Sequence, residues 1–271
     1  MIAEVIRACP CCDFSGAKPK FKVSTFIVVK CLSCSLVYLG NPPKGDGLYD
    51  EYYSDREPSS DAYRYDSSDP ALRELYEINQ QRIKNIKLFK TDGKLLDIGC
   101  GRGQFLKTAS EHGYYADGID VSERAVAYAR REYGRNAEVR MLAEVVASGE
   151  QFDVVTLWHV LEHFINPYEA LWQISTLLKR GGICVVEVPN LHSFKFMMSK
   201  TKWHGGNHPL FHRTFFSAKT LRAALLRSGF SRVQRLNISY HVPGRNELYE
   251  AVKRTLNVVA MDAFLDFVAW K

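Results

Sequence analysis

The feature that most constrains the fold is a short apolar run closed by a glycine-rich turn, Leu95–Ile98 followed by Gly99, Gly101 and Gly103. An apolar run of this length that ends at glycine predicts a buried strand. Glycines directly after a strand let the backbone turn tightly and approach a ligand, and they aim the start of the next helix at it. The pattern therefore predicts a ligand site at the end of a strand.

A second predicted strand, 115–121, carries an acid at its end, Asp120, seventeen residues past Gly103. An acidic side chain at this position can accept hydrogen bonds from both hydroxyls of a ribose. We therefore expect a nucleoside-bearing cofactor to lie across the ends of two parallel strands.

Strand and helix patterns alternate through the middle of the chain, which predicts an α/β fold with a doubly wound, mostly parallel sheet. We expect strands at 94–99, 115–120, 137–142, 152–157, 183–188 and 231–239. We expect helices at 70–90, at the sheet edge, and at 103–112, 122–133, 217–228 and after Asn166. Residues 246–262 have helical periodicity, and Phe264–Trp270 is expected to be a closing antiparallel strand. Dimerisation or contact with a membrane surface is the alternative for this apolar tail.

Four of the seven cysteines have metal-ligand spacing, as the pairs Cys9/Cys12 and Cys31/Cys34 separated by eighteen residues. Two residues between thiolates let both sulfurs reach one ion, and two such pairs complete a tetrahedral zinc site. Cys11 is then the spare thiol. Forty residues build little core, so the metal would supply folding energy, and four thiolates leave no open position for catalysis. This predicts a structural zinc ribbon.

The net charge of +6 is unevenly distributed. Residues 46–70 carry eight acids and two bases, whereas residues 195–254 carry twelve bases and two acids. A basic segment after the last core strand favours an anionic substrate, with a solvated surface as the alternative. The sequence lacks a run of bilayer-spanning length and a signal peptide's apolar core, so we expect a cytoplasmic protein.

Five blocks resemble, in order and in spacing, the class I S-adenosylmethionine-dependent methyltransferases. They are Asp97–Gly103, Gly118–Ser122, Phe152–Thr156, Val160–His163 and Leu178–Gly182. The resemblance covers roughly residues 75–240 and implies a Rossmann-like methyltransferase with S-adenosylmethionine as its cofactor. A zinc ribbon followed by a tyrosine-acid cluster, Leu48–Tyr53, resembles a branch often tied to sugar, polysaccharide or secondary-metabolite pathways.

The chain is accordingly divided into a zinc ribbon at 1–40, a linker at 41–69 and a methyltransferase domain at 70–271. Within that domain, residues 191–215 are expected to cover the substrate, and residues 246–271 to form a C-terminal helix and strand. Tyr52 and Tyr53 of the linker either cover the cofactor or pack the ribbon on the main domain, and packing is the preferred interpretation.

The resemblance also implies which residues contact the cofactor. The methionine part is expected to be held by Asp97, Gly99, Cys100, Gly101 and Gly103, and the ribose by Asp120. Residues expected near the adenine are Val121, Leu142 and Ala143, with Glu144 as a candidate beside its amino group. His159 is expected to border the methyl-transfer site.

Two histidine clusters are candidates for catalysis, Trp158–His163 and Trp203–Arg213. In-line methyl transfer to a hydroxyl requires alignment and removal of a proton, which histidine can accept near neutral pH. We predict His208 or His212 as the general base, with Arg213 or Lys202 on an anionic group. His159 is a further catalytic candidate.

His159, Glu162 and His163 leave a further alternative open. They could bind a divalent ion, as a related ExxEH block does in some RNA and quinone methyltransferases, with His159 replacing the first acid. Hydrogen bonds that stabilise the loop are the preferred interpretation.

The predicted function is O-methylation of a small or carrier-linked, hydroxylated and anionic molecule, such as a sugar or pathway intermediate. A sugar C-methyltransferase is one alternative. An RNA methyltransferase that uses the ribbon and residues 195–254 is another, so nucleic acid stays open as a partner. The intact Asp97 and Asp120 argue against a binding module without activity. The Leu161–His163 block argues against a nicotinamide oxidoreductase. A homodimer is left open.

Overall fold

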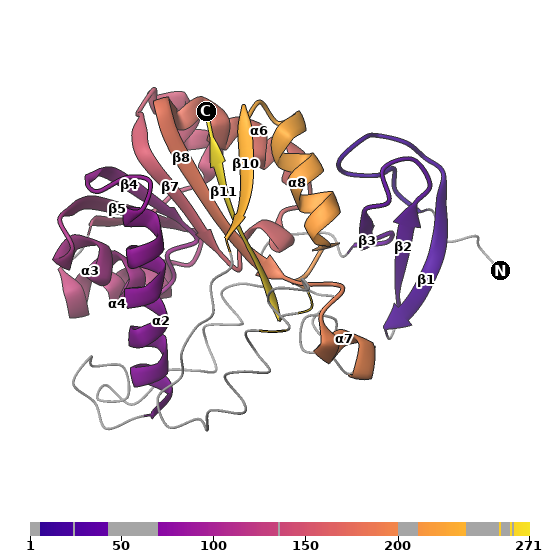
Figure 1. The fold of residues 1–271 in the computed structure, drawn as a ribbon, viewed down its shortest axis with the longest axis horizontal. Coiled ribbons are helices and arrows are strands. Elements are labelled where there is room, and N and C mark those ends of the chain that lie inside the picture. The colour runs from indigo at the N-terminus through magenta and orange to yellow at the C-terminus, as the bar shows by residue number, and fades with distance from the viewer. Residues whose placement is uncertain are drawn as a thin grey trace.

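In the computed structural model the main domain is built on a seven-stranded sheet (Figure 1). The structure describes residues 6–23, 25–42, 70–134, 136–199, 211–236, 255, 261 and 263–271. The strand order is β10-β11-β8-β7-β4-β5-β6. The strands are β4 (Gly93–Ile98), β5 (Tyr114–Asp120), β6 (Asn136–Val139), β7 (Phe152–Trp158), β8 (Leu178–Pro189), β10 (Arg232–Leu236) and β11 (Phe264–Trp270).

Strands β4 to β8 pair in parallel, and β11 lies antiparallel between β8 and β10. The predicted fold class, including the antiparallel strand at Phe264–Trp270, is confirmed. The chain adds β5 and β6 on one side of β4 and then crosses to add β7 on the other. Such a reversal leaves a crevice for ligands at the carboxyl ends of the strands.

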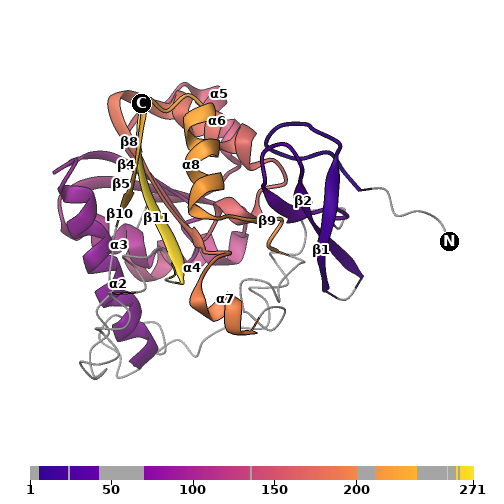
Figure 2. The ribbon, with the colours of Figure 1, turned by 45° about the vertical axis from the view of Figure 1, so that its right-hand side comes forward.

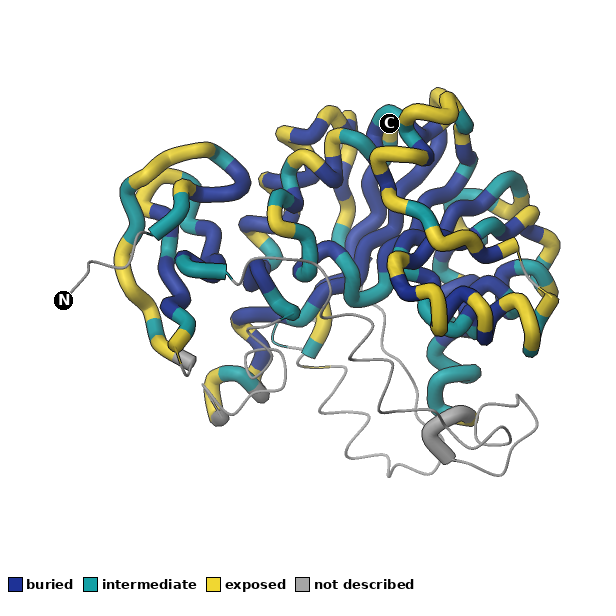
Figure 3. The backbone as a smooth tube through the Cα atoms, turned by 180° about the vertical axis from the view of Figure 1, so that it is seen from behind, coloured by how far each residue is buried: buried dark blue, intermediate teal, exposed yellow. Residues whose placement is uncertain are grey.

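Helices cover both faces of the sheet, because neighbouring residues of a strand point to opposite faces. Leu95 and Val154 belong to the core under α2, α3 and α4, whereas Leu96 and Val155 belong to the core under α5, α6 and α8. Figure 3 shows the buried strands between partly exposed helices. The helices are α2 (Pro70–Lys87), α3 (Gln104–Glu111), α4 (Glu123–Tyr133), α5 (Leu142–Ser148), α6 (Pro167–Leu177) and α8 (Ala218–Arg227).

Helix α2 lies against a face of the sheet, so the expectation that it occupies the sheet edge is wrong. Ile83 and Ile86 are fully buried in the core that α2 shares with β4, β7 and β8. Arg82, on the same side of α2, forms an ion pair with Glu187 of β8.

The strand expected at 137–142 is shorter than the sequence suggested. It ends at Val139, and Leu142 already begins α5. The carboxylate of Glu144 accepts a hydrogen bond from the Met141 amide at 2.6 Å, and Gly149 ends the helix in the left-handed region. Local capping therefore turns the end of the predicted strand into a helix.

The N-terminal cysteine segment forms a second sheet that includes a strand from the main domain (Figure 2). β1 (Ala17–Val23), β2 (Phe26–Cys31) and β3 (Val37–Leu39) are antiparallel, and β3 also pairs with β9 (Thr214–Phe215). The short elements near β9 are η1 (Leu161–His163) and α7 (Phe194–Ser199).

Several predictions lie outside the described residues and stay predictions. They concern Leu48–Tyr53 with Tyr52 and Tyr53, Lys202, His208 and nearly all of 246–262. Among the described helices, none has the length and apolar character needed to cross a membrane. The apolar residues of β11 form part of the central sheet, which overturns the surface role considered for them.

Candidate functional site

The glycine turn after β4 adopts a conformation that only glycine takes readily. Gly99, Gly101 and Gly103 have φ values of 68°, 52° and 80°. A Cβ atom added to Gly99 would lie 2.5 Å from Cγ2 of Val160, which leaves no room for a side chain. The turn is therefore a narrow backbone cradle between the ends of β4 and β7.

The carboxylate of Asp120 is clamped at the end of β5. Its Oδ2 accepts a hydrogen bond from the Gly101 amide, and its Oδ1 accepts one from the Ser122 amide, both at 2.9 Å. These bonds fix the carboxylate beside the turn and at the start of α4. An acid held in this way is preorganised to accept the two hydroxyls of a ribose.

Cys100 contributes only its backbone to the site. Its side chain is 7% exposed and lies in the core, where a Cβ added to Gly118 would be 2.8 Å from it. The amides of Gly99 and Cys100 both donate to the carbonyl of Ile119, at 2.8 and 3.0 Å. These two amides therefore extend the β4–β5 pairing.

The side predicted to hold the adenine has apolar side chains exposed at the ends of β5 and β6. Val121 and Met141 are 49% and 57% exposed, and Ala143 is exposed as well. Leu142 instead points into the core, and Glu144 caps α5. Sequence reasoning missed Met141. The cradle, the clamped acid and this apolar surface together fit the methionine, ribose and adenine parts of S-adenosylmethionine.

Asp97 lies on β4 beneath the turn and is 2% exposed. The Thr156 hydroxyl on β7 donates a hydrogen bond to its Oδ1 at 2.7 Å. Burial raises the pKa of Asp97 to about 7, despite this hydrogen bond and the charge of Arg82. The carboxyl group is thus poised to lose its proton when a positive charge approaches.

His159, directly after β7, has a left-handed backbone with φ of 58°, which is costly for a residue with a side chain. Two contacts to Glu187 of β8 hold it there. The His159 amide donates to the Glu187 carbonyl at 2.9 Å, and Nε2 lies 2.9 Å from Oε1 of Glu187. Burial would lower the pKa of His159, but the charges of Glu187 and Glu162 outweigh burial and raise it to about 9. The two carboxylates thus favour the protonated imidazole, which disfavours His159 as the general base and leaves its place beside the methyl-transfer site a prediction.

A buried ion pair supports His159 from below, and sequence reasoning missed it. Arg82 of α2 pairs with Glu187, donates a hydrogen bond to Oδ1 of Asn79 at 3.0 Å, and stacks over Trp158 with 4.2 Å to the ring centroid. Two signals were present in the sequence. One is an acid within the apolar run Ile183–Val188, and the other is an arginine beside the apolar positions of α2.

Glu162, His163 and His212 form a second cluster, in which Glu162 is buried and the two histidines are partly exposed. One potential ligand atom from each lies within 4.8 Å of the others. Glu162 is 1% exposed, and neither of its carboxylate oxygens has a hydrogen-bond partner among the described residues. The neighbouring nitrogens are Nδ1 of His159 at 3.7 Å and Nε2 of His163 at 4.0 Å. The Glu162 carboxylate thus makes no hydrogen bond to the loop among the described residues, whereas its backbone carbonyl accepts from the Arg213 amide and Nδ1 of His163 lies 3.1 Å from the Phe211 carbonyl.

His163 is neutral near pH 7, because burial and the neighbouring His212 lower its pKa to about 4. Its Nδ1 lies 3.1 Å from the Phe211 carbonyl, so the proton belongs on Nδ1 and the lone pair on Nε2, towards Glu162. The His212 ring packs edge-on against His163 with 4.9 Å between centroids. Despite burial, His159 and the other neighbouring imidazoles hold the pKa of Glu162 below its ordinary value, so the carboxylate is charged where it faces the Nε2 lone pair of His163.

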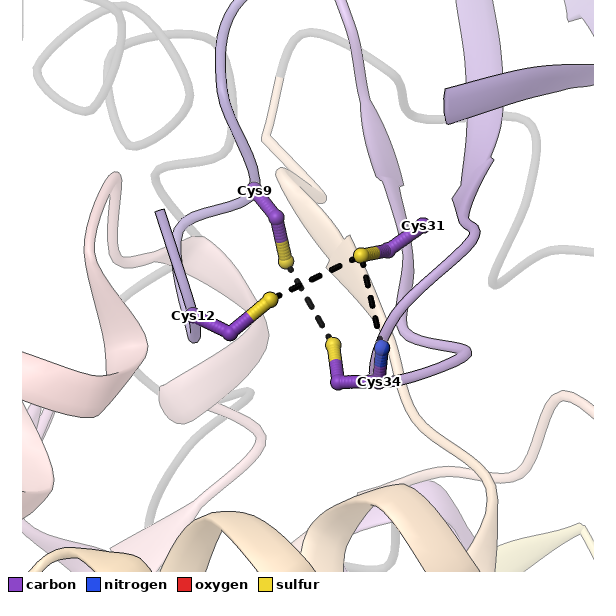
Figure 4. Close-up of side chains that lie close together, drawn as sticks. All are labelled: Cys9, Cys12, Cys31 and Cys34. Atoms are coloured by element: carbon purple, nitrogen blue, oxygen red, sulfur yellow. Dashed lines mark hydrogen bonds between the residues drawn. The ribbon is translucent and has the colours of Figure 1, made fainter. Parts of the chain in front are cut away.

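The four predicted metal ligands converge in the N-terminal segment (Figure 4). Sγ of Cys9 lies 3.5 Å from Sγ of Cys34, and Sγ of Cys12 lies 3.6 Å from Sγ of Cys31. A tetrahedral zinc ion at about 2.3 Å from each sulfur places the sulfurs about 3.8 Å apart, so the cluster fits zinc. Cys11 is outside the cluster, and burial raises its pKa to about 12.

The two cysteine pairs have the same local geometry. The residue after the second cysteine of each pair, Asp13 or Ser35, has a left-handed backbone with φ of 54° or 65°. The Asp13 amide donates to the Cys9 carbonyl, and the Ser35 amide donates to the Cys31 carbonyl. Each pair thus forms a tight knuckle that points both sulfurs to one centre.

Comparison with known proteins identifies the class. Residues 71–235 match the family described as "Methyltransferase domain". This match covers more than half of the chain, so the chain belongs to the methyltransferase domain family. The enzyme class predicted from the glycine turn and its companion blocks is confirmed.

The curated relatives include ubiquinone biosynthesis O-methyltransferases. The protein of Stutzerimonas stutzeri (strain A1501) is 34% identical over 129 residues, which are 45% of this chain and 56% of the relative. That of Leptothrix cholodnii is 30% identical over 148 residues, 51% of this chain and 63% of the relative. The chain thus spans less than two thirds of the length of these relatives.

Solved structures share the fold at low identity. A S-adenosylmethionine-dependent methyltransferase from Archaeoglobus fulgidus superimposes with a TM-score of 0.54 and 22% identity, covering 72% of this chain and 94% of that one. The plantazolicin methyltransferase BpumL in complex with S-adenosylhomocysteine gives 0.55 and 18%, covering 83% and 93%. Both show the fold alone.

The buried acid Asp97 should give a pH-dependent stability. Between its ordinary pKa of 3.8 and the raised value of about 7, the unfolded chain releases this proton and the folded protein keeps it. The free energy of unfolding should therefore fall as pH rises through this range and then level off. In Asp97→Asn this contribution should be absent in thermal unfolding between pH 4 and 8. An unchanged pH profile would contradict the assignment.

Removing the charge of Asp120 should selectively weaken cofactor binding. Asp120→Asn loses charge-assisted hydrogen bonds to the ribose and to the turn, so the affinity for S-adenosylhomocysteine should fall about 100-fold or more by calorimetry. Asp117→Asn, the same change on the same strand, is the matched control and should stay within about threefold of the parent. Equal losses in both variants would remove Asp120 from the site.

Proposed function

We propose that this protein transfers the methyl group of S-adenosylmethionine to a hydroxyl group of a small or carrier-linked molecule. The observation that carries the proposal is the clamped carboxylate of Asp120 beside the glycine cradle Gly99–Gly103. The cofactor would supply the reactive sulfonium methyl group. The names of the curated relatives support oxygen as the acceptor atom.

The cluster of Glu162, His163 and His212 is the proposed acceptor side. It follows β7, at the same end of the sheet as the turn after β4, and His212 comes from the segment predicted to cover the substrate. We assign His212, which is partly exposed, as the general base. The buried Glu162 would stabilise the imidazolium that forms when His212 takes the hydroxyl proton. His208 remains the alternative base.

We further propose that the acceptor carries a negative charge, because residues 195–254 are strongly basic. Arg213 is 2% exposed and lies inside the protein, so its predicted contact with an anionic group is not supported. Lys202 stays a candidate for that contact. A sugar-like acceptor likewise stays part of the proposal. We also propose that the four cysteines bind zinc.

The proposal is tested by transfer of a labelled methyl group from S-adenosylmethionine to a panel of hydroxylated acceptors and their O-methylated counterparts. His212→Ala should lower kcat by about 100-fold or more while the affinity for S-adenosylhomocysteine stays unchanged. His112→Ala, at the far end of α3, is the control and should retain kcat. Transfer to the already O-methylated compounds, or full activity of His212→Ala, would contradict the proposal.

A divalent cation at Glu162, His163 and His212 is a second candidate, favoured by the convergence of one ligand atom from each residue within 4.8 Å and by the lack of a hydrogen bond to the Glu162 carboxylate among the described residues. Carboxylate and imidazole ligands suit several transition metals. A cation held by these residues would lower the pKa of an acceptor hydroxyl bound to it. Native mass spectrometry should then show two metal equivalents per chain. His163→Ala should lose one equivalent and keep the other, and a cysteine variant, Cys12→Ser, should show the reverse. If the parent binds a single metal equivalent and His163→Ala keeps it, the cation site is rejected and the general-base mechanism is retained.

A further inference from the structure

We propose that the cysteine ribbon positions the acceptor side of the catalytic site, through β9 and Arg7, while the cofactor side is held independently within the main domain. The catalytic meaning of this coupling rests on the function proposed above for His212. The mechanical coupling itself is argued from contacts alone.

The segment 213–216 is bonded to the ribbon on one side and to the main domain on the other. The Leu39 amide of β3 donates to the Arg213 carbonyl at 2.9 Å, and Thr214 and Phe215 pair with the ribbon strand. On the other side, the Leu191 amide, just after β8, donates to the Phe216 carbonyl at 2.8 Å. A strand of two residues is held in place mainly by such neighbours.

The same segment fixes the catalytic cluster. The Arg213 amide donates to the Glu162 carbonyl at 2.8 Å, and His212 is the preceding residue. The position of His212 relative to Glu162 therefore depends on the backbone of Arg213, whose amide group is bonded to Glu162 and whose carbonyl group is bonded to the ribbon. A shift of about 1 Å in such a group is enough to lower a catalytic rate strongly.

Arg7 is the second link between the ribbon and the site. Its guanidinium donates to the carbonyls of Leu39 at 2.9 Å, Ile165 at 2.8 Å and Arg213 at 3.5 Å. These carbonyls belong to β3, to the turn after η1 and to the residue before β9, so one side chain joins three segments. Its amide donates to the Gly40 carbonyl, and its carbonyl accepts from the Tyr38 hydroxyl at 3.1 Å.

The metal ligands lie directly beside this link. Cys9 is two residues from Arg7, and Cys9, Tyr38, Leu161 and Phe216 belong to one continuous core cluster. Cysteine coordination would therefore fix the backbone that carries Arg7, and the hydrogen bonds of Arg7 would transmit its position to the turn after η1 and to the residue before β9. The same core cluster also contains Ile98 of β4 and Ile119 of β5, so the difference between the two sides rests on these hydrogen bonds and not on core packing. The ribbon thus holds the acceptor side in position.

The cofactor side is built from different contacts. The amides of Gly99 and Cys100 donate to Ile119, and that of Gly101 donates to Asp120, all between β4 and β5. Neither strand pairs with the ribbon sheet. Disturbing the ribbon should therefore affect the acceptor side and spare cofactor affinity.

The test uses two variants of the whole chain and one control. Arg7→Ala removes the link and leaves the cysteines, Cys12→Ser breaks the metal site, and Lys18→Ala changes an exposed ribbon residue. For each we would measure zinc content, S-adenosylhomocysteine affinity, hydrogen exchange by mass spectrometry and, once an acceptor is known, kcat and KM.

Arg7→Ala should retain zinc and bind S-adenosylhomocysteine within about twofold of the parent, while amides in 211–216 exchange about tenfold faster or more. Its kcat should fall by about tenfold or more, with the KM for S-adenosylmethionine unchanged. Cys12→Ser should lose zinc and show the same pattern, and Lys18→Ala should match the parent.

Two results would overturn the coupling. One is unchanged exchange in 211–216 when zinc or Arg7 is lost, and the other is a parallel loss of cofactor affinity. Both readouts are independent of methyl transfer. Faster exchange at 211–216 with full kcat would instead retain the coupling and remove His212 from catalysis, so the two proposals fail separately.

Discussion

The parallel pairing of β4 with β5 and β7 is the constraint on which the site depends. It places Asp97 opposite Gly118 on one side and Thr156 on the other, and it brings the glycine turn level with Asp120. A shift of one residue in either register would turn Asp97 away from Thr156 and move Asp120 off the turn. The cofactor site is thus a consequence of strand register. The register places the donors and acceptors of the site close enough to form its hydrogen bonds.

Two buried acids near the end of β7 have opposite surroundings. Glu187 is paired with Arg82 and His159, so its charge is compensated and it holds His159 in a strained backbone. Glu162 has imidazoles nearby and no hydrogen bond among the described residues. Burying a charge without hydrogen bonds is costly. Proteins tolerate this cost where a bound ligand or a transferred proton interacts with the charge. The two acids therefore differ in that the charge of Glu187 is compensated by a buried ion pair, whereas Glu162 has only imidazoles near it.

Local signals predicted the parts of the molecule that local chemistry determines. The glycine turn, Asp120, the cysteine knuckles and the alternating strands are each encoded within a few residues, so the sequence was sufficient. The sequence shows Arg82 and Glu187 as charged residues among apolar positions, but their pairing joins residues far apart in the chain, so it could not be predicted. Strand β9 has two residues and no periodicity, so it could not be predicted either. Asp97 was predicted to hold the cofactor, but its raised pKa depends on burial that only the assembled sheet provides.

The position of β11 has a consequence for the order of folding. β11 follows β10 in the chain and separates β10 from β8 in the sheet, so β10 has no edge to join until β11 has been synthesised. The parallel strands β4 to β8 can assemble earlier, and α8 can pack on α6, whereas β10 must wait for β11. β3 of the ribbon waits in the same way for β9, with its edge unpaired although all four cysteines have been made. Assembly of the two sheets is therefore limited by contacts between distant parts of the chain, which makes slow, late closure the expected folding step.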